Sequence, residues 1–229
     1  AYTSNSGCTL HLIDCSGNTV TANTCTTFGS YSPYQIGASG AWQSIEPVLS
    51  PFSANALWSS IGGGMANRIW PGGFFGRIGG GQVNWIRGQA MNGYIGGGMF
   101  NQISASTSSV VVGGNINYVL NTHHSSIVGG HMNKIGKVGG GDTHANFIGG
   151  GGLNFIPDET TYSSIVGGWY NSINNDSDYN FIGGGRFNKL GNTTNVLWTN
   201  YSSIVGGEAN KIAGDGNADY AAIVNGSGN

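Results

Sequence analysis

A short motif with fixed internal spacing recurs along this chain and constrains its fold more than any other feature. The stretch "IGGGMANRI" at residues 61–69 begins with an apolar residue, numbered offset 0 below. Glycines follow at offsets 2 and 3, Asn at offset 6 and a second apolar residue at offset 8. Self-similarity at a short, nearly constant period is typical of a solenoid, in which each repeat buries its apolar face only against its neighbours. Nine copies, mostly 16–17 residues apart, begin at Ile61, Ile78, Ile95, Val111, Ile127, Ile148, Ile165, Ile182 and Ile204.

Two further copies are irregular. One begins at Val138 and has His144 where the Asn is expected, and the other begins at Ile223 and reaches only Asn229. Counting both, we expect a solenoid of about ten to eleven turns. The copies stand farther apart near the end of the chain, where residues 193–199 and 213–219 are interpreted as loop insertions.

The composition favours short β-strands over helices. The 229 residues include 43 glycines, and no stretch keeps a helical apolar stripe free of glycine. We therefore expect an all-β fold, a parallel β-roll. The net charge is −2 and the eight Lys and Arg are scattered along the sequence, which predicts no nucleic-acid partner. No apolar run approaches the roughly 20 residues of a membrane span, and no signal-like segment is present, so we expect a mature soluble product without membrane insertion.

Residues 1–56 differ in composition from the repeat region, residues 57–229. They hold only five of the glycines but three of the five prolines and all three cysteines. We interpret them as a β-rich cap or connector, with strands expected at 9–13 and 19–22. Cys8, Cys15 and Cys25 are close enough in sequence for one disulfide, as in exported proteins, with the third thiol unpaired or intermolecular. Metal binding by these thiols and His11 is the alternative.

The repeat offsets suggest distinct structural roles. Apolar residues at offsets 0 and 8 would form two inward columns, because alternate side chains of a strand face opposite ways. Glycines at offsets 2 and 3 would supply a positive φ or a close backbone approach. Asn at offset 6 tolerates left-handed φ and can hydrogen-bond to its turn and to its equivalents in neighbouring turns. The first predicted inward column contains Ile61, Ile78, Ile95, Ile127, Ile148, Ile165, Ile182 and Ile204. The predicted ladder contains Asn67, Asn84, Asn101, Asn117, Asn133, Asn154, Asn171, Asn188 and Asn210.

The stretches "IGGGMANRI", "IGGGQVNWI" and "IVGGHMNKI" resemble a known repeat type. They are similar to the Gly-Gly-x-x-Asn repeats of left-handed β-roll proteins, namely the YadA-like heads of trimeric autotransporter adhesins and related bacteriophage fibre proteins. The resemblance covers about residues 57–229. It implies a left-handed parallel β-roll, usually trimeric, displayed outside a cell or virion. The chain differs from the autotransporters in lacking an evident coiled-coil neck and membrane-anchor barrel, and in carrying the cysteine-containing front segment.

Catalytic chemistry has little support in the sequence. His123 and His124 lie in a repeat linker without a nucleophile elbow. Asp158 with Glu159, and Asp176 with Asp178, are paired acids interpreted as solvated loops rather than a general acid and base. No catalytic residue and no firm cofactor is therefore predicted. Calcium is the one candidate ligand, because two linkers alternate oxygen-bearing residues. Those candidate ligands are Asp176, Asp178, Asn180, Asp215, Asn217 and Asp219.

Aromatic residues at variable offsets are the remaining signal. Trp70, Trp85, Trp169 and Tyr170 are candidates for glycan binding, with packing between turns or subunits as the alternative. The leading interpretation is an extracellular structural subunit of a surface fibre or filament, with adhesion to surfaces or to cell-surface glycans as a second role. A trimeric bacteriophage tail-fibre or receptor-binding segment is the second. A polysaccharide-cleaving enzyme on a β-solenoid, from a different class of protein, is ranked last.

Self-assembly is the expected partnership. The final repeat stops at Asn229, before the apolar residue due at offset 8, so its turn is unfinished. We expect the front segment of one subunit to cover that open edge on the next, which would give a head-to-tail filament. Side-by-side homotrimers, or a chain cut from a longer fibre, are the alternatives.

Overall fold

The computed structural model describes residues 58–70, 72–137, 143–174, 177–191, 199–213 and 218–229. It also describes the backbone of four short strands nearer the N-terminus. Two compact units are present, residues 1–32 and residues 33–229. In the first, β1 (Leu10–Ile13) pairs antiparallel with β2 (Thr19–Ala22), at the two places where strands are expected. In the second, β3 (Gln35–Ile36) pairs antiparallel with β4 (Trp42–Gln43). The three cysteines lie outside the described residues.

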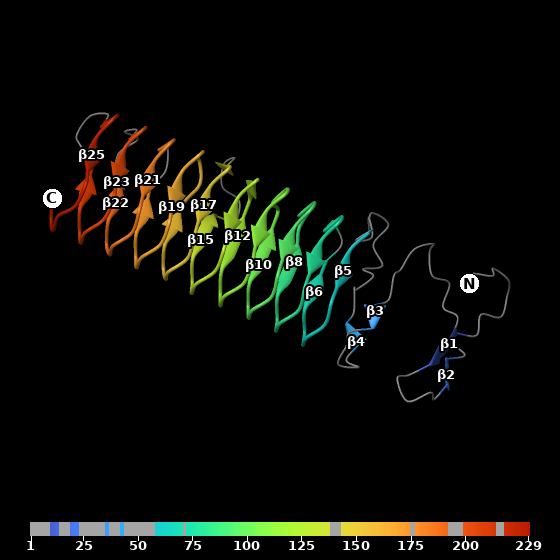
Figure 1. Cartoon of the computed structure of the whole chain (residues 1–229). Coiled ribbons are helices and arrows are strands. Elements are labelled where there is room, and N and C mark those ends of the chain that lie inside the picture. Colours follow the sequence, from blue (N-terminus) through green and yellow to red (C-terminus); the bar gives the residue numbers. More distant parts are fainter. Residues whose placement is uncertain are drawn as a thin grey trace. The chain divides into compact units, whose positions relative to one another are not determined.

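The repeats form a parallel β-solenoid, whose turns follow one another in sequence order (Figure 1). The offset-0 residues of successive turns pair directly, as Ile61 does with Ile78 and Ile78 with Ile95. This register builds a ten-stranded parallel sheet. Its strands are β5 (Ser60–Ile61), β7 (Arg77–Ile78), β9 (Tyr94–Ile95), β11 (Val110–Val111), β14 (Ser126–Ile127), β17 (Phe147–Ile148), β19 (Ser164–Ile165), β21 (Phe181–Ile182), β23 (Ser203–Ile204) and β25 (Ala222–Ile223).

The offset-8 residues build a second parallel sheet of nine strands. Its strands are β6 (Arg68–Ile69), β8 (Trp85–Arg87), β10 (Gln102–Ser104), β12 (Tyr118–Leu120), β15 (Lys134–Gly136), β18 (Phe155–Ile156), β20 (Ser172–Ile173), β22 (Lys189–Leu190) and β24 (Lys211–Ile212). A row of single β-bridges at offset 4, from Met65 to Ser227, links the turns between the two sheets. A short pair, β13 (Thr122–His123) with β16 (Thr143–His144), lies on the third side of the coil.

The number of turns is smaller than expected. Ten offset-0 strands define nine complete turns from Ile61 to Ile223. The copy beginning at Val138 does not form a turn of its own, because Ile127 pairs directly with Ile148 and Ile135 with Ile156. His144 instead pairs with His123 on the third side. One turn is thus lengthened, and a longer loop costs little because loop-closure entropy grows slowly with length.

Two columns of aliphatic side chains fill the interior. The eight isoleucines of the first expected column are each at most 1% exposed, and the offset-8 residues from Ile69 to Leu190 are fully buried. Each buried isoleucine contributes about 1.5–3 kcal/mol relative to an exposed one. Stability therefore accumulates turn by turn, and the outward positions are left free to vary.

Two corners of each turn place a non-glycine residue in the left-handed region. At offset 5, the residues from Ala66 to Ala209 have φ between 53° and 59°, including the β-branched Val83 and Ile116. Three residues before offset 0, from Trp58 to Tyr220, φ lies between 52° and 62°. The prediction that the offset-6 Asn supplies the left-handed residue is wrong, because the bend falls one residue earlier. Backbone hydrogen bonds between turns hold this left-handed conformation. For example, Val83 N donates to Met65 O of the preceding turn at 2.8 Å.

The two glycines of the motif differ. At offset 3, Gly98 has φ +83°, and a Cβ there would overlap the carbonyl oxygen of Gly114. At offset 2, Gly97 has a φ outside the left-handed region, and nothing lies within 4 Å of its Cβ position. The expected roles thus hold at offset 3, whereas neither role explains the glycine at offset 2.

Candidate binding surfaces

The predicted Asn residues lie inside the solenoid and complete its backbone hydrogen bonding. Asn101 Nδ2 donates to Gly97 O of its own turn and to Gly114 O of the next, both at 2.9 Å. Its Oδ1 accepts from Asn117 N at 3.0 Å and from Asn117 Nδ2 at 3.1 Å. All nine side chains are at most 3% exposed. Buried amides with these partners are structural and unavailable to a ligand.

A second internal ladder, missed in the sequence, lies two residues before offset 0. Ser163 N donates to Asn146 Oδ1 at 2.8 Å, Ser163 Oγ accepts from Asn180 N at 3.0 Å, and Asn180 Oδ1 accepts from Ser202 N at 2.9 Å. The first Ser of the recurring "SSIVGG" marks this position in three turns. In both ladders, the residue directly before the ladder residue has a left-handed backbone, and the residue directly after it begins a strand. The two halves of a turn therefore share one arrangement of corner, buried polar residue and strand.

The described calcium candidates are engaged in the turns. Asp178 Oδ1 accepts from Thr161 N at 2.7 Å, and Asp219 Oδ1 accepts from Asn200 N at 2.8 Å, so each carboxylate caps the preceding turn. Asn180 points inward, as described above. Asp176, Asp215 and Asn217 lie outside the described residues. Across the described ranges, no three His, Cys, Asp or Glu side chains gather as metal ligands.

The paired acid Asp158–Glu159 is not the solvated loop that was expected. Asp158 is 4% exposed, whereas Glu159 is exposed and has φ 55°. The two carboxylates therefore do not share one environment. His123 and His144 face each other from adjacent turns, with ring centroids 5.0 Å apart.

The four aromatic residues proposed for glycan binding fall into two separate places. Trp70 and Trp85 lie on the outer face of the nine-stranded sheet, where the Arg68 guanidinium stands 4.7 Å from the Trp70 ring centroid. Trp169 and Tyr170 lie at offsets 4 and 5 of a turn five turns beyond that of Trp85. At about 4.8 Å per turn, that separation is about 24 Å. They cannot form one small site.

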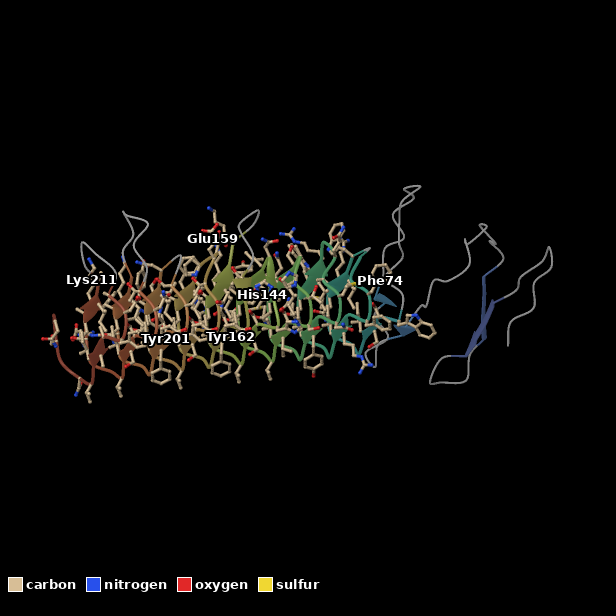
Figure 2. All side chains as sticks on the ribbon, turned by 90° about the horizontal axis from the view of Figure 1, so that it is seen from above. Phe74, His144, Glu159, Tyr162, Tyr201 and Lys211 are labelled. Atoms are coloured by element: carbon tan, nitrogen blue, oxygen red, sulfur yellow. The ribbon has the colours of Figure 1, made fainter. Side chains whose placement is uncertain are left out.

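A tyrosine column along one edge was also missed. Tyr162, Tyr179, Tyr201 and Tyr220 occupy the left-handed corner before the ten-stranded sheet and stack with centroids 5.1, 4.8 and 5.0 Å apart. Figure 2 shows Tyr162 and Tyr201 along this edge, with Glu159 and Lys211 along the opposite edge. The inner rings cover each other's faces. The column therefore stabilises successive turns and offers mainly ring edges and hydroxyls to solvent.

The outer face of the ten-stranded sheet is apolar and almost uncharged. Its side chains come from the residues just before and just after offset 0, and the only charged one is Arg77 in this part of the structure. Phe147 is followed two residues later by Gly149, and Ser126 by Val128, although Ser60 is followed by Gly62. Four serines, at positions 60, 126, 164 and 203, are the uncharged polar residues of the face. Valine side chains at Val112, Val128, Val166, Val205 and Val224 are 45–72% exposed. The offset-2 glycines border this face.

The outer face of the nine-stranded sheet carries most of the positive charge. Five of the eight Lys and Arg lie at offsets 7 and 9, and no acid occupies those offsets in any turn. The Lys and Arg residues are scattered along the sequence, but the repeat brings five of them to one face of the solenoid. Burial, and then the neighbouring charge of Lys211, lower the pKa of Lys189. The five cations are Arg68, Arg87, Lys134, Lys189 and Lys211.

Comparison of the chain with known proteins finds no matching family model and no matching curated sequence. The described part of the chain contains no helix long and apolar enough to cross a membrane.

Proposed function

We propose that this chain is a non-enzymatic structural subunit of an extracellular fibre, assembled by lateral contact between solenoids. The observation that carries the proposal is the outer face of the ten-stranded sheet. Its exposed valines and nearly complete lack of charge resemble the core of a protein–protein interface, where charged residues are depleted. The resemblance of the repeat to surface-displayed β-rolls supports the extracellular location.

The offset-2 glycines support the same contact. A Cβ at Gly97, Gly113 or Gly184 would meet nothing within 4 Å, so the fold itself leaves room for a side chain there. Glycine in a strand region also marks a place where another backbone approaches closely. A bare strip beside a flat apolar face allows a second solenoid to pack near the main chain.

Electron microscopy and light scattering of the purified chain test the proposal. We expect elongated assemblies with more than one solenoid in cross-section. Val128→Lys with Val166→Lys, which places charges on the apolar face, should leave the circular dichroism spectrum unchanged and shift the chain to monomers. The matched control, Met65→Lys with Met132→Lys, changes two side chains that are 57% and 42% exposed at another corner. A native chain that stays monomeric at high concentration, or a control pair that disrupts assembly equally, would contradict the proposal.

A further inference from the structure

A linear cationic surface with an aromatic hollow lies on the outer face of the nine-stranded sheet. We propose that this face binds an acidic polysaccharide whose charges are carboxylates on sugar rings. The inference names a ligand class for the adhesive role and rests on the proposed function only in assuming that the chain is displayed outside a cell or virion.

The cations follow the long axis of the solenoid. Arg68, Lys134, Lys189 and Lys211 are all at offset 7 of their turns, and Arg87 is at offset 9 of the second turn. Lys189 and Lys211 stand directly beside each other in register. Burial, and then repulsion from Lys211, lower the Lys189 pKa. A carboxylate placed between them would relieve that repulsion.

Aromatic side chains support several of these charges and form a hollow among them. Lys134 Nζ lies 5.3 Å from the Phe155 ring centroid, and Arg87 Cζ lies 5.9 Å from the Trp85 centroid. Gln102, oriented with its side-chain oxygen toward Arg87, accepts from Nε at 3.0 Å and from Nη2 at 2.9 Å. These contacts fix the direction of the guanidinium. A small depression beside them is lined by Val83, Trp85, Phe100, Asn101, Gln102 and Tyr118.

The combination matches an acidic sugar chain. A sugar ring presents C–H groups that pack on aromatic walls such as those of Phe100 and Tyr118, while its carboxylate is a bidentate partner for a guanidinium. A chain of such rings would lie along the long axis of the solenoid, across successive turns, and meet a cation at intervals.

Nucleic acid fits this surface less well. Nine strands at about 4.8 Å span about 40 Å. A DNA duplex of that length carries more than 20 phosphates at one per about 1.7 Å, against five cations here. Guanidinium and ammonium groups also stand over Trp70, Trp85 and Phe155, so these rings are not open platforms for bases. Five cations over this length come closer to a single chain with one carboxylate per sugar ring than to a two-stranded duplex.

Titration of the purified chain with polygalacturonate, dextran and a single-stranded oligonucleotide tests the proposal. We expect polygalacturonate to bind at low salt and to dissociate as salt rises, dextran not to bind, and the oligonucleotide to bind more weakly than polygalacturonate. Arg87→Gln with Lys134→Gln should weaken polygalacturonate binding at least about tenfold, because each cation loses a charge-assisted hydrogen bond. The matched control, Arg77→Gln with Arg186→Gln, removes two charges from other faces and should change binding less than about twofold, as expected for exposed, screened charges.

Several results would overturn the proposal. These are no polygalacturonate binding at low salt, equal binding of dextran, tighter binding of the oligonucleotide, or an equal loss in the control pair. Light scattering of the same samples reports assembly separately. The Val128→Lys and Val166→Lys chain should still bind polygalacturonate, so failure of the fibre proposal and failure of this one are distinguishable.

Discussion

The two large sheets of the solenoid share one kind of interior and have opposite exteriors. Ile95 in the ten-stranded sheet and Ile103 in the nine-stranded sheet are both fully buried. Outside, the ten-stranded sheet presents valines, glycines, serines and a few aromatic rings with one described charge, and the nine-stranded sheet presents lysines, arginines and aromatic rings. The repeat therefore fixes the inward positions, whereas each outward face can acquire its own surface chemistry. We expect contact between solenoids on one face and ligand binding on the other.

The two glycines of the motif provide the sharpest test of how far the fold constrains the apolar face. Gly98→Ala places a Cβ against Gly114 O at φ +83° and should destabilise the chain by about 5 kcal/mol or more, in the tail of point-mutant effects. Gly97→Ala, one residue earlier, should change stability by less than about 1 kcal/mol, because nothing lies within 4 Å of its Cβ position. Urea unfolding of both variants measures the difference. Equal losses would show that the fold itself requires the offset-2 glycine.

Equal contributions of the two sheets to the stability of the core can be tested at one buried isoleucine from each sheet. Ile95→Ala and Ile103→Ala each open a cavity in a fully buried column and should each cost about 2–5 kcal/mol. We expect the two values to agree within about 1 kcal/mol, because the columns have the same depth and the same neighbours above and below. Thermal and denaturant unfolding measure both. A difference of more than about 2 kcal/mol would mean that one sheet dominates the core.

The smallest expected effect concerns charge on the cationic face. Lys211→Gln removes a neighbouring positive charge and should raise the pKa of Lys189 part of the way toward its ordinary value, leaving the shift caused by burial. The folded chain holds this proton less tightly than the unfolded chain, so stability rises with pH between the lowered pKa and the ordinary one. NMR titration of the Lys189 side-chain amine reports the change. Arg186→Gln is the control, since Arg186 lies on another side and pairs with Glu208 at 2.7 Å.

Sequence reasoning reached the solenoid fold and the inward aliphatic residues but placed the corner one residue late. Asn is the usual non-glycine residue with positive φ, which made offset 6 the natural choice. The bend falls instead on Val83, Ile116 and their equivalents, residues that disfavour it. Asn is needed for its hydrogen bonds across turns, and its fixed position forces the preceding residue into the left-handed region.

The sequence by itself determined that the chain is an all-β solenoid, because a period of about 17 residues with apolar positions at fixed offsets has few other ways to bury them. It also determined which aliphatic residues face inward. Only the tertiary structure decided that the copy at Val138 forms no turn, that Asp158 is buried, and that scattered cations share one face. Those properties depend on which turn each residue joins and on what lies beside it there. The pairing register between neighbouring turns decides these three properties, and spacing along the chain does not reveal that register.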